Sequence, residues 1–218
     1  MAGFREMKAT RSRTKDVVFI GLFIALITVS AWVTVPIGPI PVTLQMFAIP
    51  LAICVLRPSI ATASVYGYIL LGALGVPVFS GMRGGIGALL GPTGGFLFGY
   101  LVAVPVACAL LFLALRAGWV KDAPQKDPLA KGGAVFARVK QTLASSGMYV
   151  VCGILFTLIS YGFGVAWFMV MTDVGLEAAL AACVLPFIIP DLVKIVLAAG
   201  CANVLAPLAQ RQQAGAPA

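Results

Sequence analysis

The sequence predicts an all-α integral membrane protein with six transmembrane helices. Of its 218 residues, 61% are hydrophobic and only 10% are charged, whereas a soluble domain normally carries about a quarter charged residues. The apolar residues gather in five or six stretches that approach the roughly 20 residues needed to cross a hydrocarbon core. Most of the chain is therefore spent on membrane spans, and little sequence remains for a separate soluble domain.

Prolines separate the first three predicted helices. Pro36 ends the first helix, and the loop over residues 37–42 is too rich in proline to stay helical. A second, short helix follows, and Arg57 with Pro58 then turns the chain directly into a third helix. The expected ranges are residues 17–35, 43–56 and 60–76.

A glycine-rich segment, residues 77–95, separates these helices from the remaining three. It contains too much glycine for a stable helix and lacks the polar periodicity of a water-exposed loop, so we expect it to fold back into the protein. The last helix begins near Pro190, because proline is favoured in the first turn and the carboxylate of Asp191 then lies near the positive helix end. The other helices are expected over 96–115, 148–172 and, as a short connection, 175–185.

Basic residues assign both chain termini to the cytoplasm. Five cations precede the first helix, one lies between the second and third, six lie in the linker between the fourth and fifth, and one follows the last helix. These 13 of the 15 cations fall on one side of a six-span topology, as the positive-inside rule requires. We therefore expect a basic cytoplasmic N-terminus over 1–16, a membrane domain over 17–208 with a basic cytoplasmic linker over 116–146, and a disordered polar tail over 209–218.

The two remaining cations and one acid are candidate ligand contacts. Arg83 lies in the glycine-rich connection, and Asp191 and Lys194 lie near the start of the last helix. A charge at membrane depth is costly unless a partner or a cavity compensates it. The trio carries one net positive charge and suits a ligand with one anionic group and hydrogen-bond donors for the acid. Because Asp191 and Lys194 share a helical face, a purely structural ion pair is the alternative.

Three uncharged residues complete the candidate site. Thr43 and Gln45 lie at the outer start of the second helix, where each side chain either caps the helix or faces a ligand. For Thr43 both roles stay open, whereas Gln45 lies too deep for a simple cap and is expected to face a cavity. Tyr161 is by default a packing or interfacial aromatic, and we retain it as a candidate ligand contact.

A pair of small residues on the first helix predicts a docking face. Gly21 and Ala25 are one turn apart, a spacing that lets another helix approach closely. Packing within the protein is the alternative, because such pairs are common in membrane helices.

Other classes of site lack their residues in this sequence. There is no histidine, the five cysteines show no C-x-x-C spacing, and no G-x-x-x-x-G-K-[ST] phosphate loop is present. The basic residues lie beside apolar runs, so there is no soluble fold to hold a nucleic-acid groove. We expect no metal, no cofactor and no nucleic-acid partner.

Four separated strings together resemble the BioY family. They are P-I-P-V-T-L-Q-M at 39–46, L-G-A-L-G-V-P-V-F-S-G at 71–81, G-P-T-G-G-F at 91–96 and L-P-F-I-I-P-D-L-V-K at 185–194. The resemblance covers residues 17–205 apart from the basic linker, whose length looks unusual for the family. Where the family usually has P-G-D, this chain has I-P-D at 189–191.

The resemblance implies a six-helix substrate-binding subunit, or S component, of an energy-coupling-factor (ECF) transporter in a bacterial inner membrane. The implied ligand is biotin, bound from outside. The implied partners are a membrane coupling protein (T component) and two ABC-type ATPases, which hydrolyse ATP, so the chain itself is not an enzyme. The family's acid and lysine of the last helix correspond to Asp191 and Lys194, and its docking face corresponds to Gly21 and Ala25.

The residues alone leave a rival class open. A self-sufficient, ion-coupled secondary transporter of a small carboxylate vitamin would also need a charged cavity. The absence of histidine, of several intramembrane acids and of visible inverted repeats disfavours this class. A membrane enzyme is disfavoured further, because no Ser-His or metal-ligand constellation is present.

Overall fold

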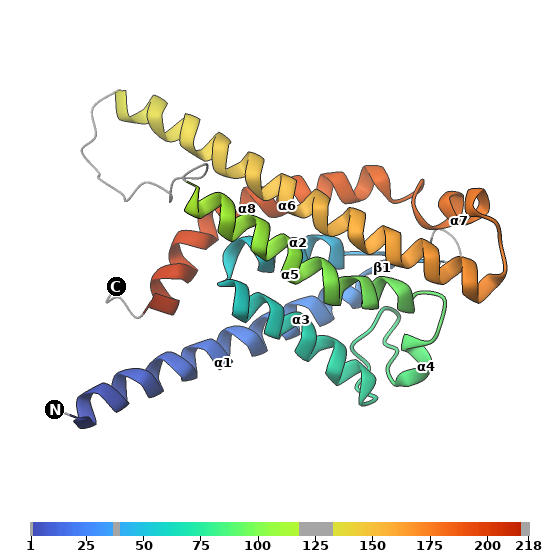
Figure 1. Ribbon diagram of the computed structural model, residues 1–218, viewed down its shortest axis with the longest axis horizontal. Helices are drawn as coiled ribbons and strands as arrows, with labels where there is room; N and C mark the ends of the chain where they lie inside the picture. The colour runs from blue at the N-terminus through green and yellow to red at the C-terminus, as the bar shows by residue number, and fades with distance from the viewer. Residues whose placement is uncertain (1, 37–39, 118–132, 215–218) are drawn as a thin grey trace.

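The computed structural model describes residues 2–36, 40–117 and 133–214, and its helices run along one long axis (Figure 1). In chain order the elements are α1 (Ala2–Trp32), β1 (Thr34–Val35), β2 (Val42–Thr43), α2 (Gln45–Val55), α3 (Pro58–Ala73), α4 (Ile86–Leu89), α5 (Gly94–Arg116), α6 (Gly133–Thr172), α7 (Leu176–Cys183) and α8 (Ile188–Ala214). The two strands pair antiparallel, with Thr34 opposite Thr43 and Val35 opposite Val42.

Four stretches in the described part of the chain are long and apolar enough to cross a membrane. They are Arg13–Trp32, Gly94–Arg116, Ser146–Thr172 and Ile188–Ala206. The other two expected spans correspond to α2 and α3, which have 11 and 16 residues and fall short of the roughly 20 that a perpendicular span needs. The helical membrane fold is therefore confirmed, and four of its six predicted spans meet the length criterion.

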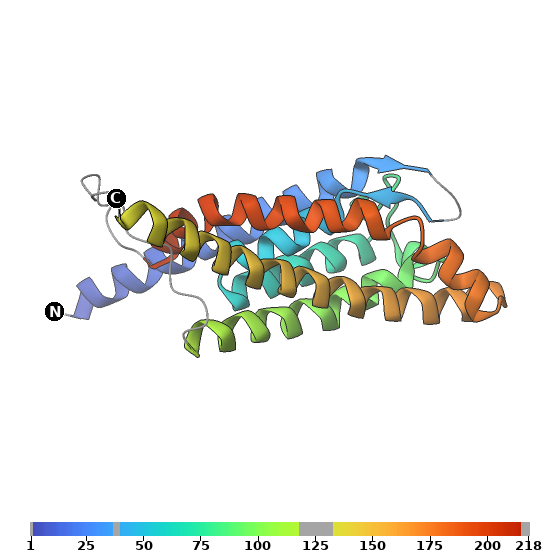
Figure 2. The same ribbon diagram turned by 90° about the horizontal axis from the view of Figure 1, so that it is seen from above.

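The two ends of the bundle carry different elements. The start of α1, the end of α5, the start of α6 and the end of α8 lie at one end of the long axis (Figures 1 and 2). The paired strands, α4 and α7 lie at the other end (Figures 1 and 2). Both described chain ends therefore lie at the same end of the bundle.

The first predicted helix was wrong at both of its ends. It begins at Ala2 rather than Val17, because the residues before Val17 are mostly good helix formers and their positive charge does not interrupt a helix. It ends at Trp32, and β1 takes the place of its last expected residues. Of the loop expected over 37–42, residues 37–39 lie outside the described residues and Val42 belongs to β2. Thr34 and Val35 are β-branched and precede Pro36, and both properties favour an extended backbone.

Two predicted boundaries in the second half were also wrong. The linker expected over 116–146 is helical from Gly133, as the first part of α6. The tail expected to be disordered from residue 209 continues α8 as far as Ala214. In both segments alanine, glutamine, lysine and arginine are good helix formers, so a polar composition does not end the helix. The rest of the linker, residues 118–132, and of the tail, residues 215–218, lie outside the described residues.

Glycines bring α5 and α6 into close contact. A Cβ added to Gly95 would lie 2.7 Å from the backbone oxygen of Phe163, and one added to Gly99 would lie 3.0 Å from the Cα of Ser160. Only bare glycine tolerates such an approach of two helix backbones. The contact brings Phe96 of α5 against Tyr161 of α6, with ring centroids 6.4 Å apart in an edge-to-face arrangement.

Candidate ligand-binding site

A cavity lies among the elements that are farthest from the chain ends. Its walls come from β2 and the start of α2, the α3–α4 connection, the first turns of α5, and from α6, α7 and α8. About 650 Å³ within it is not filled by protein atoms, including space open to solvent. Five of the six candidate site residues line the cavity, and Lys194 is the exception.

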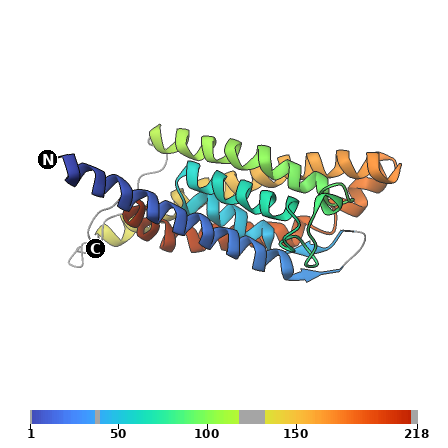
Figure 3. The ribbon, with the colours of Figure 1, turned by 90° about the horizontal axis from the view of Figure 1, so that it is seen from below.

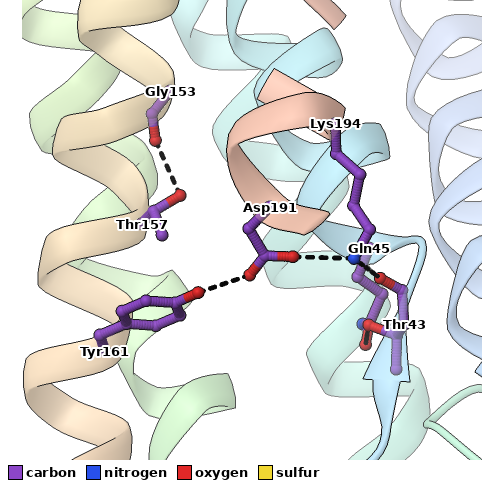
Figure 4. Close-up of polar contacts among 7 residues, drawn as sticks. All are labelled: Thr43, Gln45, Gly153, Thr157, Tyr161, Asp191 and Lys194. Carbon is purple, nitrogen blue, oxygen red and sulfur yellow. Dashed lines mark hydrogen bonds and ion pairs between the residues drawn. The ribbon is translucent and has the colours of Figure 1, made fainter. Parts of the chain in front are cut away.

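Asp191 is the buried acid of the cavity wall. Only 2% of its surface is exposed, and it receives two hydrogen bonds (Figure 4). The hydroxyl of Tyr161 donates to Oδ2 at 2.7 Å, and the ammonium of Lys194 donates to Oδ1 at 2.8 Å. Because a buried carboxylate without such donors would be costly, these two hydrogen bonds compensate the burial of Asp191 in the cavity wall.

Lys194 supports Asp191 without lining the cavity. Its Nζ also donates to the backbone oxygen of Thr43 at 2.9 Å, which links the start of α8 to β2 (Figure 4). The ion pair that the sequence offered as a purely structural alternative is therefore present. This ion pair is compatible with ligand binding, because Asp191 lines the cavity whereas its partner Lys194 does not.

Thr43 and Gln45 form one hydrogen-bonded chain. The hydroxyl of Thr43 donates to Oε1 of Gln45 at 3.3 Å, and Nε2 of Gln45 donates to the hydroxyl of Tyr68 at 2.8 Å. Leu44 is the residue at the N-cap of α2, and it makes no side-chain cap hydrogen bond. The capping alternative for Thr43 was therefore wrong. Both side chains instead order the cavity wall where β2 meets α2.

Arg83 lies in a tight turn of the α3–α4 connection. The N–H of Phe79 donates to the backbone oxygen of Arg83 at 2.9 Å, and Gly81 and Met82 have φ of 69° and 56°. These consecutive left-handed residues reverse the chain. Nε of Arg83 donates to the backbone oxygen of Ser80 at 3.1 Å, and the exposed side chain makes no ion pair with a described residue. Its charge is available to a ligand.

The apolar walls include residues that the sequence analysis did not single out. They are Phe79, Phe96, Tyr100, Cys183 and Phe187, together with the polar Ser80. Most of them lie inside or beside the four BioY-like strings, which was the one signal available for finding them. Burial raises the pKa of the Cys183 thiol in α7 from 9.0 to about 11, so this cavity residue stays protonated and uncharged at neutral pH.

Two tryptophans hold loops that adjoin the cavity. The indole N–H of Trp32, at the end of α1, donates to the backbone oxygen of Pro77 at 2.9 Å. The indole N–H of Trp167, in α6, donates to the backbone oxygen of Gly91 at 3.0 Å. Each tryptophan therefore fixes one end of the glycine-rich segment to a membrane helix, which explains how that segment folds back as predicted.

The predicted docking residues lie on an open face of α1. Gly21 and Ala25 are exposed, and an added Cβ at Gly21 would meet no atom within 4 Å. Phe23 and Ile27 on the opposite face are buried, where α1 packs against α2 and α3 at the edge of the bundle (Figure 3). The alternative of packing within the protein was therefore wrong for this pair.

Comparison with known proteins places the chain in a family. A model of the BioY family matches residues 6–211. The chain belongs to the BioY family. A relative from Pyrococcus horikoshii, named a probable biotin transporter BioY, is 36% identical over 182 residues, which cover 84% of this chain and 90% of the relative. A biotin transporter BioY from Rhodobacter capsulatus is 33% identical over 196 residues, covering 84% and 88%.

The BioY fold is also found in a solved structure. The crystal structure of an S component for biotin from an ECF-type ABC transporter superposes with a TM-score of 0.69 and 22% sequence identity, covering 88% of this chain and 91% of the other. This likeness confirms the fold of an S component.

All four BioY-like strings meet at the cavity. The first contributes Thr43 and Gln45, the second Phe79, the third Phe96 and the fourth Asp191. Segments that are far apart in the sequence thus form one wall around one space. The strings that carry the family resemblance are the strings that build the candidate site.

Proposed function

We propose that this BioY-family chain is the biotin-binding S component of an ECF-type transporter and mediates biotin uptake. One observation carries the proposal. The cavity combines a buried hydrogen-bond acceptor, Asp191, with largely apolar walls and with a cation, Arg83, that makes no ion pair with a described residue. The names of the relatives, which are biotin transporters, support the same ligand.

Biotin matches the chemistry of this cavity. Its ureido ring offers two N–H donors, which suit the carboxylate of Asp191 and the hydroxyl oxygen of Tyr161 as acceptors. Its bicycle and alkyl tail are apolar and suit the aromatic walls. Its carboxylate needs a cation, and Arg83 supplies one, since Lys194 is already paired with Asp191. We therefore assign the carboxylate to Arg83 and the ureido ring to Asp191, with Gln45 and Thr43 beside it.

We further propose that six helices cross a bacterial inner membrane, with both termini in the cytoplasm. The short α2 and α3 complete the crossing together with the β1–β2 hairpin and the folded-back segment that continue them. The elements that line the cavity then face the outside, because β2, α4 and α7 lie at the end of the bundle opposite the chain ends (Figures 1 and 2). The distribution of basic residues supports this orientation.

Transport then depends on partner proteins. We propose that the T component docks on Gly21 and Ala25 of α1 and that two ABC-type ATPases supply the energy. The exposure of both residues supports this assignment, and the sequence has no phosphate loop of its own.

Uptake of labelled biotin tests the proposal against a secondary transporter. The chain is expressed with its T component and ATPases, with ATPases that cannot hydrolyse ATP, and alone in vesicles carrying a proton or sodium gradient. We expect accumulation of biotin only in the complex with active ATPases. Accumulation driven by an ion gradient in vesicles that contain this chain alone would contradict the proposal and establish the secondary transporter.

A further inference from the structure

The turn that carries Arg83 also contributes a second polar residue to the cavity lining. Ser80 lines the cavity, and its Oγ is buried and makes no hydrogen bond within the described part of the chain. The backbone oxygen of the same residue accepts the hydrogen bond from Nε of Arg83 at 3.1 Å. Ser80 and Arg83 are thus neighbours in space, on one turn, facing one cavity.

An unpaired buried hydroxyl is unusual in a folded protein. Most buried polar side-chain atoms have a hydrogen-bond partner, and one left without a partner destabilises the protein. Two fully buried serine hydroxyls in the described residues bond to their own helices: Ser64 donates to the backbone oxygen of Ile60, and Ser160 donates to that of Phe156. Ser80 has no helix carbonyl to use, because the turn around it is tight and left-handed at Gly81. Its hydroxyl is therefore free to serve a ligand.

We propose that Ser80 is a specificity-determining residue that donates a hydrogen bond to the carboxylate of the ligand. The inference rests on the proposed function and extends it. A carboxylate has two oxygens, so it accepts hydrogen bonds from the guanidinium of Arg83 and the hydroxyl of Ser80 together. The anion cannot bind beside Asp191 equally well, because Asp191 is itself an anion and its neutralising Lys194 lies outside the cavity wall.

This arrangement gives the turn a defined role. The left-handed residues Gly81 and Met82 hold Ser80 and Arg83 close enough to share one anion, and the hydrogen bond from Phe79 closes the turn. The ligand is then recognised at two separate ends. Ser80 and Arg83 bind its carboxylate, and Asp191 accepts hydrogen bonds from its N–H groups. A neutral analogue of the same shape keeps only the second contact.

Ser80→Ala tests the inference on the purified full-length chain. We expect the variant to bind biotin about tenfold more weakly, as for the loss of one hydrogen bond to a charged group. It should bind biotin amide less than about threefold more weakly, because no anion is present there. Ser80→Thr keeps the hydroxyl and should retain most of the affinity. Ser64→Ala removes a buried hydroxyl outside the cavity and should leave the affinity for biotin unchanged.

Each other outcome overturns the inference in a different way. If Ser80→Ala binds biotin as the wild type does, Ser80 is not a ligand contact and the proposed function stands without it. If the variant loses affinity for biotin and for biotin amide equally, the hydroxyl does not read the carboxylate. If the wild-type chain itself does not bind biotin, the proposed function and this inference fail together.

Discussion

The polar network around Asp191 has to serve both folding and ligand binding. Tyr161 and Lys194 hold the buried carboxylate within 2.8 Å, while the same carboxylate lines the cavity. Removing one partner of a buried pair leaves an unpaired group, so a loss of ligand affinity alone does not separate the two roles. Variants of Asp191 and Lys194 have to be compared in stability and in affinity together.

Asp191→Asn keeps the shape of the side chain but replaces a charged acceptor with a neutral one. We expect a loss of about 1.5 to 3 kcal/mol in biotin binding, which is roughly tenfold to over a hundredfold in affinity. Asp191→Asn together with Lys194→Met removes the unpaired charge and should restore thermal stability but not affinity. A double variant that binds biotin normally would show that the pair is structural only.

Arg83 and Lys194 should differ in what they recognise. Arg83→Gln removes the cation that lines the cavity, so it should weaken the binding of biotin much more than that of biotin amide. Lys194→Met acts through Asp191, which faces the ureido ring, and should weaken both ligands to a similar extent. Binding of the two ligands to both variants measures this difference, and the assignment is wrong if Lys194→Met proves to be the variant selective for the carboxylate.

At the residue scale the sequence predicted the charged half of the site. Arg83, Asp191 and Lys194 stood out because charges are rare at membrane depth. Ser80 and Phe187 did not, because serine and phenylalanine are common in membrane helices and only the fold brings these two to the cavity. The i,i+3 spacing of Asp191 and Lys194 had already suggested the ion pair that the structure shows, whereas the hydrogen bond from Lys194 to the backbone of Thr43 depends on the fold.

Among the helices, α5 shows how a proline is tolerated in a membrane span. Pro105 has no N–H to donate to the backbone oxygen of Leu101, four residues earlier. The hydroxyl of Tyr66, on α3, donates to that oxygen at 2.8 Å. The side chain of one helix thus replaces the missing backbone hydrogen bond of the next, which matters because no water competes in the hydrocarbon core.

Tyr66→Phe should therefore destabilise the protein by about 1 to 3 kcal/mol. The same substitution should cost less in a Pro105→Ala background, where residue 105 can donate its own N–H. Thermal unfolding in detergent of the two single variants and the double variant measures the coupling. An equal loss of stability in both backgrounds would mean that the tyrosine hydroxyl does not compensate for the proline.

The order of the helices was predictable from the sequence, whereas the residues at which they begin and end were less predictable. The apolar runs, Pro36 and the Arg57–Pro58 turn gave the existence and order of the main helices, and the short helix before α8 was also expected. Polar stretches were misread as loops at the start of α1 and of α6 and at the end of α8. A polar side chain indicates contact with water but does not prevent a helical backbone. These stretches consist largely of good helix formers, so they are helical despite their polarity.

At the scale of the whole molecule, we propose a ligand site at one end of the bundle and a docking face along α1. Gly21 and Ala25 lie on the exposed side of α1, opposite the buried Phe23 and Ile27. Replacing both by tryptophan should abolish assembly with the T component and uptake, while biotin binding to the isolated chain stays unchanged.

Leu158→Trp is the matched control for these tryptophans, because Leu158 is 62% exposed on α6 and belongs to neither assigned surface. It should assemble and transport normally. Loss of biotin binding in the α1 variant would mean that Gly21 and Ala25 contribute to the fold rather than to docking. Copurification of the T component and binding of labelled biotin to each variant separate these outcomes.

Binding of labelled biotin to the purified, isolated chain tests the central claim most directly. We predict saturable binding at one biotin per chain, displaced by unlabelled biotin and strongly weakened by Asp191→Asn. The claim requires that neither ATP nor a partner protein is needed for this step. A correctly folded chain that fails to bind biotin, or that binds it equally well after Asp191→Asn and Arg83→Gln are combined, would contradict the assignment of this cavity as the biotin site.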